Sequence, residues 1–224
     1  MVEKSQRRVA LDRQIEARKE SILDAAILEF IDNGIDNSRI SDIAKRAGVG
    51  AVTVYRYFEN KPKLVIECAE KLWKSEIKSL SPRLNTPNYK ALNGFEKAAH
   101  ILSVLCSLHE ICPVSLRLLE QFDNYVVKEH ISGEQLLKYE EGIIDTRKIL
   151  LKAIYEGQRD SSVRSDIDAL QFYATATHAL VALSQKLLLR GDVIQNDRDT
   201  DAKTQISLLA EMELNYIKGM NEVR

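Results

Sequence analysis

The chain has 224 residues, of which 45% are hydrophobic, and its 32 basic and 33 acidic residues give a net charge of −1. This composition allows one large or two small domains with a sizeable core. The near-zero net charge excludes proteins that bind nucleic acid through an excess of positive charge over the whole chain. The three cysteines, the absence of a recognisable secretory leader and the lack of a long apolar run predict a cytoplasmic protein with no membrane partner.

Residues 1–14 are predicted to form a mobile arm. Its basic side chains could follow a phosphate backbone or lie in a minor groove, and a solubilising tail is the alternative. These side chains are Lys4, Arg7, Arg8 and Arg13. A first helix is expected over 16–32, ended by Gly34. Its apolar stripe consists of Ile22, Leu23, Ala26, Ile27 and Phe30.

Residues 38–61 (SRISDIAKRAGVGAVTVYRYFENK) predict two short helices joined by a glycine turn. Ser38 is the expected N-cap of the first helix, because its hydroxyl can accept from a free amide. Gly48 is expected to end that helix in the left-handed conformation. The apolar stripe of the first helix is Ile40, Ile43, Ala44 and Ala47. On the second helix we expect Val52, Tyr55 and Phe58 to face inward and Ala51, Thr53, Arg56 and Tyr57 to face outward.

Such a helix pair is a helix-turn-helix candidate, whose second helix enters the major groove of double-stranded DNA. Between residues 39 and 63, six basic residues stand against two acidic ones, a local charge of +4. The basic residues are Arg39, Lys45, Arg46, Arg56, Lys61 and Lys63. Because phosphate neutralisation supplies much of DNA affinity, a local basic patch favours this reading. The alternative is an amphipathic helix pair buried in an all-α core.

Residues 18–66 resemble the N-terminal domain of the TetR family of bacterial transcriptional regulators. The matching pieces are ILDAAILEFIDNG (22–34), ISDIAKRAGV (40–49) and VTVYRYFENKPKL (52–64). They carry the family's isoleucine-alanine pair, alanine-glycine-valine turn and threonine-aliphatic-tyrosine run, with a lysine after the aromatic residues. The chain departs at Gly50, where the family usually has a serine cap. Glycine is a tolerable cap at a cost of a few tenths of a kcal/mol.

The resemblance implies which residues meet the DNA. Phosphate contacts are implied for Thr53, Tyr55 and Lys61, and base-edge contacts for Ser41, Ala51, Arg56 and Tyr57. Ser38 and Gly50 complete the candidate DNA-binding set. Arg56 could pair with guanine, a contact worth about 1–3 kcal/mol of discrimination.

The rest of the chain is predicted to be helical, which makes the fold all-α. A fourth helix opens at Lys61-Pro62 and is the natural lever between a DNA-binding domain (1–60) and an effector-binding and dimerisation domain (61–224). Residues 81–88 break the chain. Five further helices, for about nine in all, are expected over 89–110, 113–129, 133–157, 167–190 and 202–221.

The helix predicted over 167–190 is apolar nearly all round and must be buried on several sides. We expect it to form an intersubunit bundle with the last helix, which carries Ile206, Leu209, Met212, Tyr216 and Met220. The resemblance implies the same: the last two helices of each subunit form a four-helix homodimer interface. A twofold dimer can read the two half-sites of a palindromic operator.

The second half offers weaker candidate sites. Cys106, His109 and Cys112 could sense a metal or the redox state, the latter also with Cys68, but core packing is the favoured interpretation. The aspartates of residues 197–201 lack the glycine and glutamate of a calcium loop and predict a solvated turn that caps the last helix. No metal site, cofactor or catalytic motif is predicted.

A ligand cavity in the second half remains the best candidate for regulation. Its predicted lining is His100, Phe122, Tyr125, Tyr139, Arg147, Phe172, Thr175 and His178. For His178, a hydrogen-bonded interface histidine is the favoured interpretation over a ligand contact. The resemblance implies a repressor that an unknown small-molecule effector releases from DNA. The alternatives are a DNA-binding protein that works with a protein partner, and a helical enzyme with a borrowed DNA-binding domain.

Overall fold

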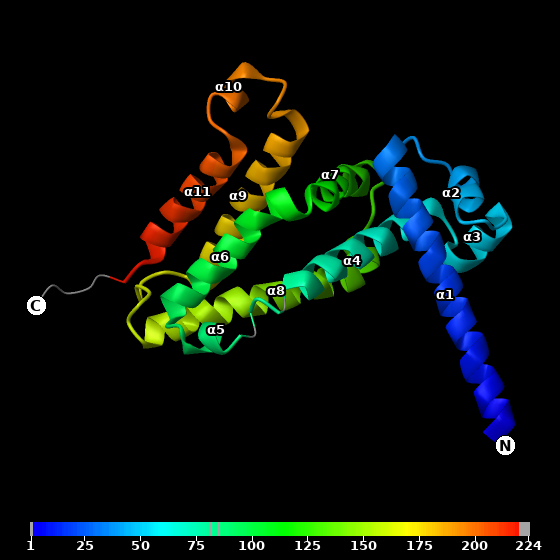
Figure 1. Cartoon of the computed structure of the whole chain (residues 1–224), viewed down its shortest axis with the longest axis horizontal. Coiled ribbons are helices and arrows are strands. Elements are labelled where there is room, and N and C mark those ends of the chain that lie inside the picture. The colour runs from blue at the N-terminus through cyan, green and yellow to red at the C-terminus, as the bar shows by residue number, and fades with distance from the viewer. Residues whose placement is uncertain (1, 81, 85, 220–224) are drawn as a thin grey trace, which may run out of the picture. The chain divides into compact units, whose positions relative to one another are not determined.

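The computed structural model of the chain describes residues 2–80, 82–84 and 86–219 (Figure 1). These residues form eleven helices and no strand, which confirms the predicted all-α fold. The helices are α1 (Val2–Asn33), α2 (Ile40–Arg46), α3 (Ala51–Phe58), α4 (Lys61–Leu80), α5 (Pro87–Ala91), α6 (Gly94–Ile111), α7 (Pro113–Lys128), α8 (Gly133–Arg159), α9 (Ala169–Arg190), α10 (Gln195–Arg198) and α11 (Ala202–Ile217). The predicted bounds of α7, α8 and α9 are correct to within two residues.

Helix α1 begins at Val2, so the predicted arm over 1–14 and the predicted start at 16 are wrong. No glycine or proline occurs between Val2 and Asn33, and nothing therefore interrupts helix propagation before the apolar stripe. The helix ends where predicted. Gly34 has φ of +79° and its N–H donates to the carbonyl of Phe30 at 2.9 Å.

The chain divides into two compact units, and unit 1 comprises Met1–Leu72 with Leu118–Tyr139. Its core contains the fully buried side chains of Ile22, Phe30, Ile43, Val54, Phe58 and Leu64, contributed by α1 to α4. The second part of α7 also belongs to this unit. There the N–H of Ile35, in the loop after α1, donates to Oε1 of Gln121 at 3.0 Å. Lys128 Nζ lies 3.0 Å from Oδ1 of Asp36 in the same loop.

Unit 2 comprises Trp73–Arg117 with Glu140–Arg224. Within it α6 packs against α9 and α11 (Figure 1), and its largest fully buried side chains are Leu102, Leu150, Ile154, Leu180, Ile206 and Ile217. Helices α6 and α8 approach closely at two glycines. A Cβ added to Gly94 would lie 1.9 Å from the backbone nitrogen of Gly157. Only residues without side chains fit at this contact.

The helix predicted over 89–110 is two helices, because the sequence supplies two N-caps. The Thr86 side chain accepts from the N–H of Tyr89 and starts α5. Asn93 and Glu96 form a reciprocal capping box that starts α6. The last helix ends at Ile217 instead of residue 221; Met220 lies outside the described residues.

The aspartate segment before α11 is only partly the predicted solvated turn. Asp201 caps α11 by accepting from the N–H of Thr204 at 2.9 Å, as predicted. Asp197 is 5% exposed and lies in the short helix α10. Its carboxylate is 3.1 Å from Arg190 Nε and 3.6 Å from Lys186 Nζ, so the end of α9 neutralises it.

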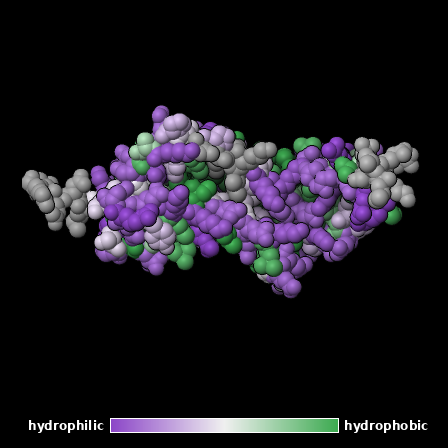
Figure 2. Space-filling model, turned by 90° about the horizontal axis from the view of Figure 1, so that it is seen from below, coloured by the Kyte–Doolittle hydropathy of each residue, from purple (hydrophilic) through white to green (hydrophobic). Residues whose placement is uncertain are grey.

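The surface in Figure 2 is mostly hydrophilic, with hydrophobic residues in small separate groups. Within the described ranges, no single helix has the length and apolarity to cross a membrane. Helices α6 and α7, which are bent by 93° at the break between them, meet that criterion together by length and composition alone.

Candidate nucleic-acid interface

Helices α2 and α3 are joined by the predicted glycine turn. Gly48 has φ of +65° and its N–H donates to the carbonyl of Lys45 at 3.2 Å, while the N–H of Val49 donates to the carbonyl of Ala44 at 3.0 Å. This pair of bonds is the Schellman motif, which needs a residue in the left-handed region at the glycine position. Gly50 then serves as the N-cap of α3 through its extended backbone. The local sequence therefore fixes the angle between the two helices.

The capping role predicted for Ser38 is wrong. The N-cap of α2 is Arg39, and Ser38 is only 3% exposed one residue earlier. Its hydroxyl donates to the carbonyl of Gly34 at 2.7 Å and thereby ties the loop to the end of α1. A hydroxyl that is buried and bonded in this way has no surface to offer to DNA.

The inward face of α3 differs from the prediction. Val54 and Phe58 are buried, whereas Val52 is 82% and Tyr55 50% exposed. Phe58 belongs to two helical stripes, one with Val54 four residues earlier and one with Tyr55 three residues earlier. Packing in unit 1 selects the first of them. Val52 therefore joins the outer face, where an apolar side chain can contact a thymine methyl group.

The outer face of the helix pair carries most of the predicted contact residues. Ser41, Gly50, Tyr55 and Arg56 are exposed, and Ala51, Thr53 and Tyr57 are half-buried. The Arg56 guanidinium carbon lies 5.5 Å from the centre of the Tyr57 ring. The two side chains thus occupy neighbouring places on one face of α3.

Three of the six basic residues between positions 39 and 63 contact other groups of the protein through their side chains. Arg46 pairs with Asp32 at 2.6 Å, which raises its pKa, and Lys63 pairs with Glu59 at 2.6 Å. Lys61 is held as described below. Among the residues that the structure describes, Arg39, Lys45 and Arg56 make no ion pair or hydrogen bond through their side chains. These three cations are available to phosphates and bases.

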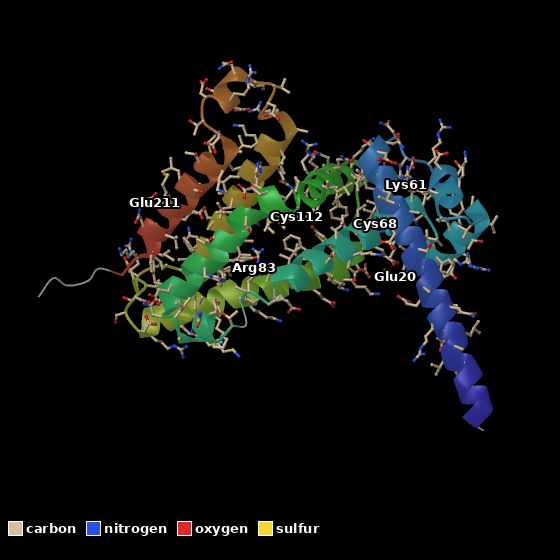
Figure 3. All side chains as sticks on the ribbon, viewed as in Figure 1. Glu20, Lys61, Cys68, Arg83, Cys112 and Glu211 are labelled. Atoms are coloured by element: carbon tan, nitrogen blue, oxygen red, sulfur yellow. The ribbon has the colours of Figure 1, made fainter. Side chains whose placement is uncertain are left out.

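Lys61 stands at the start of α4 (Figure 3) and is held by two groups of unit 1. Its Nζ donates to the carbonyl of Asp36 at 3.1 Å and lies 5.8 Å from the centre of the Tyr125 ring on α7. Burial lowers the pKa of the ammonium, and the carboxylate of Asp36 opposes that shift. A phosphate contact by Lys61 must therefore compete with these partners.

A hollow of about 390 Å³ is lined by α1, the glycine turn and α3. Its residues Leu11 and Gln14 were not predicted, because they lie on the part of α1 that the sequence assigned to an arm. The lining residues are Leu11, Gln14, Ile15, Arg18, Gly48, Val49, Gly50, Thr53, Arg56 and Tyr57. The exposed Arg18 adds a cation to the same surface. The uninterrupted run of residues before position 16, without glycine or proline, indicates that α1 extends to Leu11 and Gln14.

The residues predicted to line an effector cavity fall into two groups. Phe122, Tyr125 and Tyr139 belong to unit 1, where the rings of Phe122 and Tyr139 have centroids 4.9 Å apart. Burial raises the pKa of Tyr125 to about 12, so its phenol stays neutral beside Lys61. This group is an aromatic cluster of α7 and the start of α8.

The second group belongs to unit 2. The ring of His100 lies 5.4 Å from that of Tyr89, and its buried Nε2 has no hydrogen-bond partner among the described residues. Phe172 stacks on Tyr216 at 6.4 Å, and Arg147 is half-buried near Tyr173. Thr175 and His178 are exposed on α9. The structure therefore brings only some of the eight predicted lining residues together. Their role in binding an effector stays a prediction.

The three thiols have the environments of packed residues. Cys68 is buried and near the carbonyl of Leu23, and burial raises its pKa (Figure 3). Burial and the charge of Glu213 raise the pKa of Cys106 to about 11. Cys112 donates to the carbonyl of Leu108 at 3.3 Å. Within the described ranges no group of three His, Cys, Asp or Glu side chains is arranged to hold a metal ion.

Known proteins are similar to this chain in sequence and in fold. Residues 22–68 match the family described as "Bacterial regulatory proteins, tetR family". The chain is 31% identical over 141 residues to the fatty acid metabolism regulator protein of Bacillus subtilis (strain 168), an alignment that covers 61% of this chain and 68% of that protein.

Two solved structures extend the likeness to most of the chain. The fatty acid degradation regulator FadR of Bacillus halodurans has a TM-score of 0.64 at 18% identity, with 92% of this chain and 97% of that chain covered. FadR of Bacillus subtilis in complex with stearoyl-CoA has a TM-score of 0.58 at 21% identity, with coverages of 88% and 98%. At these identities the two structures establish the fold alone.

Proposed function

Because this chain belongs to the TetR family of bacterial regulatory proteins and is a DNA-binding transcriptional regulator, we propose that it is a homodimeric repressor that a fatty-acyl effector releases from a palindromic operator. The observation that carries the DNA-binding part is the outer face of α3. It follows a Schellman turn, it is exposed at Val52 and Arg56, and the Arg56 side chain makes no ion pair or hydrogen bond among the described residues. We place this action in the cytoplasm.

We assign base recognition to the outer face of α3 and phosphate binding to its edges. Ser41, Ala51, Arg56 and Tyr57 are proposed for base edges, with Val52 added for a thymine methyl group. Thr53, Tyr55 and Lys61 are proposed for phosphates, with Arg39 and Lys45 added because their charges have no partner among the described residues. Phosphate contacts position the protein and base contacts give it sequence preference.

We assign dimerisation to α9 and α11. On α9 one side is packed into the core of unit 2 and the other side is exposed along its length. The exposed residues include Gln171, Thr175, His178, Ala182 and Leu189 on α9 and Leu208, Met212 and Tyr216 on α11. The exposed apolar side chains within this mixed surface, which include Leu189, Leu208 and Met212, support a partner copy as its occupant. Residues 1–60 and 61–224 then remain the functional division that we propose.

We assign the effector to a fatty-acyl compound. The support is the 31% identical relative, the fatty acid metabolism regulator protein of Bacillus subtilis. In the proposed mechanism the effector binds within 61–224, α4 moves, and the recognition helices of the dimer leave the spacing of successive major grooves. A coupling free energy of about 3 kcal/mol would lower operator affinity roughly a hundredfold.

The test begins by selecting a binding site from a random duplex library with the purified chain, because no operator sequence is assumed. We expect an inverted repeat with half-site centres about one helical turn apart. Addition of stearoyl-CoA or stearate should then release the selected duplex in a fluorescence anisotropy assay. Selection of no inverted repeat would refute the dimeric DNA reader, and retention of the duplex with both compounds would refute the acyl effector.

A further inference from the structure

The N-terminal half of α1 is a helix that the protein leaves exposed. Every residue from Arg8 to Arg18 is exposed, and this part of α1 extends beyond α2 and α3 (Figure 1). Most helix stability in proteins comes from the packing of an apolar face against other elements. Two apolar side chains one turn apart on this segment are largely unpacked, since Leu11 is 56% and Ile15 44% exposed. The segment therefore has a face that no element of the chain covers.

That face forms a hollow of about 390 Å³ together with the glycine turn and α3, and we call it the α1–α3 hollow. Spacings of three and four residues place its α1 residues on one side of the helix. Those of α1 are Leu11, Gln14, Ile15 and Arg18, and those of α3 are Thr53, Arg56 and Tyr57. Within unit 1, α1 packs against α2 and α2 against α3, so the walls of the hollow are fixed relative to one another.

The charges that line the α1–α3 hollow have one sign. No acidic residue belongs to the lining. The side chains of Arg18 and Arg56 make no ion pair or hydrogen bond among the described residues. The acidic residues of the exposed segment, Asp12 and Glu16, lie outside the lining on the other side of α1. An anionic partner in the hollow would therefore meet two unpaired cations and no like charge.

This mixture of cations and apolar side chains is complementary to a DNA strand, whose backbone alternates anionic phosphates with sugars. The hollow is also continuous with the proposed DNA surface, because the outer face of α3 forms one of its walls. A recognition helix in the major groove has the backbone strand at the edge of that groove beside it. The exposed segment of α1 is about 15 Å long, which corresponds to about four base pairs along the duplex.

We propose that the α1–α3 hollow binds the sugar–phosphate backbone just outside the half-site, so that α1 lengthens the DNA contact of each subunit by about four base pairs. This inference rests on the proposed entry of α3 into the major groove. Arg18 and Gln14 bind the phosphate at the edge of the groove, and Leu11 and Ile15 contact the sugars. Arg8, three residues before Leu11, binds a phosphate farther out. Such contacts add affinity for a longer duplex without adding sequence preference.

The test compares two duplexes that carry the selected inverted repeat, by fluorescence anisotropy with the full-length protein. One duplex ends at the outer edges of the half-sites, and the other has about five further base pairs of arbitrary sequence at each end, enough to span the exposed segment. The variants are Arg18→Ala alone and Arg18→Ala combined with Arg8→Ala. The matched control is Arg13→Ala, which removes an equally unpaired, exposed arginine about 150° around α1 from the lining. None of these side chains has a partner among the described residues, so the fold should be retained.

We expect the wild-type protein to bind the extended duplex at least about fivefold more tightly than the trimmed one, with a preference that weakens as salt is raised. Arg18→Ala should lose part of this preference, and the combined variant should lose all of it. Arg13→Ala should keep the full preference. A different flank sequence should change none of these values, and melting curves verify that each variant is folded.

Four results would overturn the proposal while leaving base reading by α3 in place. They are equal wild-type affinities for the two duplexes, a full preference in the combined variant, an equal loss in Arg13→Ala, and a preference that depends on the flank sequence. If the combined variant changed the sedimentation coefficient of the protein and not its preference, the face would belong to a second copy instead. Selection of no inverted repeat would overturn the dimeric DNA reader itself, and this inference with it.

Discussion

Replacement of Arg56 by alanine separates base recognition from all other contributions to DNA binding. The side chain is exposed, makes no ion pair or hydrogen bond among the described residues, and only flanks the Tyr57 ring at 5.5 Å. We therefore expect the free energy of unfolding to change by less than about 0.5 kcal/mol. Loss of a bidentate contact with guanine should cost about 1–3 kcal/mol, a fall of about 5- to 150-fold in operator affinity.

The assay is fluorescence anisotropy with the selected duplex and with a scrambled duplex, each titrated at several salt concentrations. Arg56→Ala should weaken the selected duplex by the stated factor and the scrambled duplex by only a few-fold. The matched control is Lys63→Ala, which removes a nearby cation that Glu59 already neutralises. Equal losses on the two duplexes would mean that Arg56 contacts only phosphate, and no loss on either would refute its place in the interface.

Four other substitutions test the interface, the packing and a buried carboxyl group. Lys61→Ala should weaken selected and scrambled duplexes alike and lower the slope of log affinity against log salt by about 1, because it removes the proposed phosphate contact. Gly94→Ala should lower the melting temperature severely, since its Cβ would meet Gly157 nitrogen at 1.9 Å, whereas Gly48→Ala meets no atom within 4 Å and should cost only about 1–2 kcal/mol for its positive φ. Burial raises the pKa of Glu213 to about 7 from an ordinary 4.5. The folded chain thus keeps a proton that the unfolded chain releases, and stability should fall as the pH rises between these values. Glu213→Gln should accordingly raise the melting temperature at pH 8 but not at pH 4.

Each of these predictions has an opposite outcome that can be observed. An unchanged salt slope in Lys61→Ala would mean that the Lys61 ammonium of the wild-type protein stays with Asp36 and Tyr125 in the DNA complex and contacts no phosphate. Equal melting temperatures for the two glycine variants would contradict the close approach of α6 and α8. If Glu213→Gln raised the melting temperature equally at both pH values, the stabilisation would not come from removal of the carboxylate charge.

The helix-turn-helix was predictable because its signals are local. Glycine is the residue type that adopts a φ of +65° without strain, and it stands at position 48. The apolar spacing of Ile40, Ile43 and Ala44 defines the buried face of α2. The starts of α4 and α7 likewise follow from prolines in their first turns. Backbone preference and helical periodicity act over a few residues, so a single sequence reports them.

The predictions that the structure contradicts share a different cause. Val52 and Val54 have the same chemistry, and both fit an apolar stripe that ends near Phe58, so the choice between them depends on what packs against α3. Ser38 could cap a helix by its local sequence, but the carbonyl of Gly34 takes its hydroxyl instead. The sequence predicts that Asp197 lies in a solvated turn, but in the structure Arg190 and Lys186 of α9 pair with its carboxylate. Each outcome was set by groups distant in the sequence or by competition among near neighbours.

By itself the sequence determined the all-α fold, the DNA-reading helix pair and the family, because helix caps, turn glycines and apolar periods are properties of short segments. Only the tertiary structure decided which side of α3 is free, that Lys61 lies against Asp36 and Tyr125, and that an unbroken α1 flanks the recognition helix. These depend on which side chains from distant segments compete for the same space and the same hydrogen bonds, and that competition exists only in the folded chain.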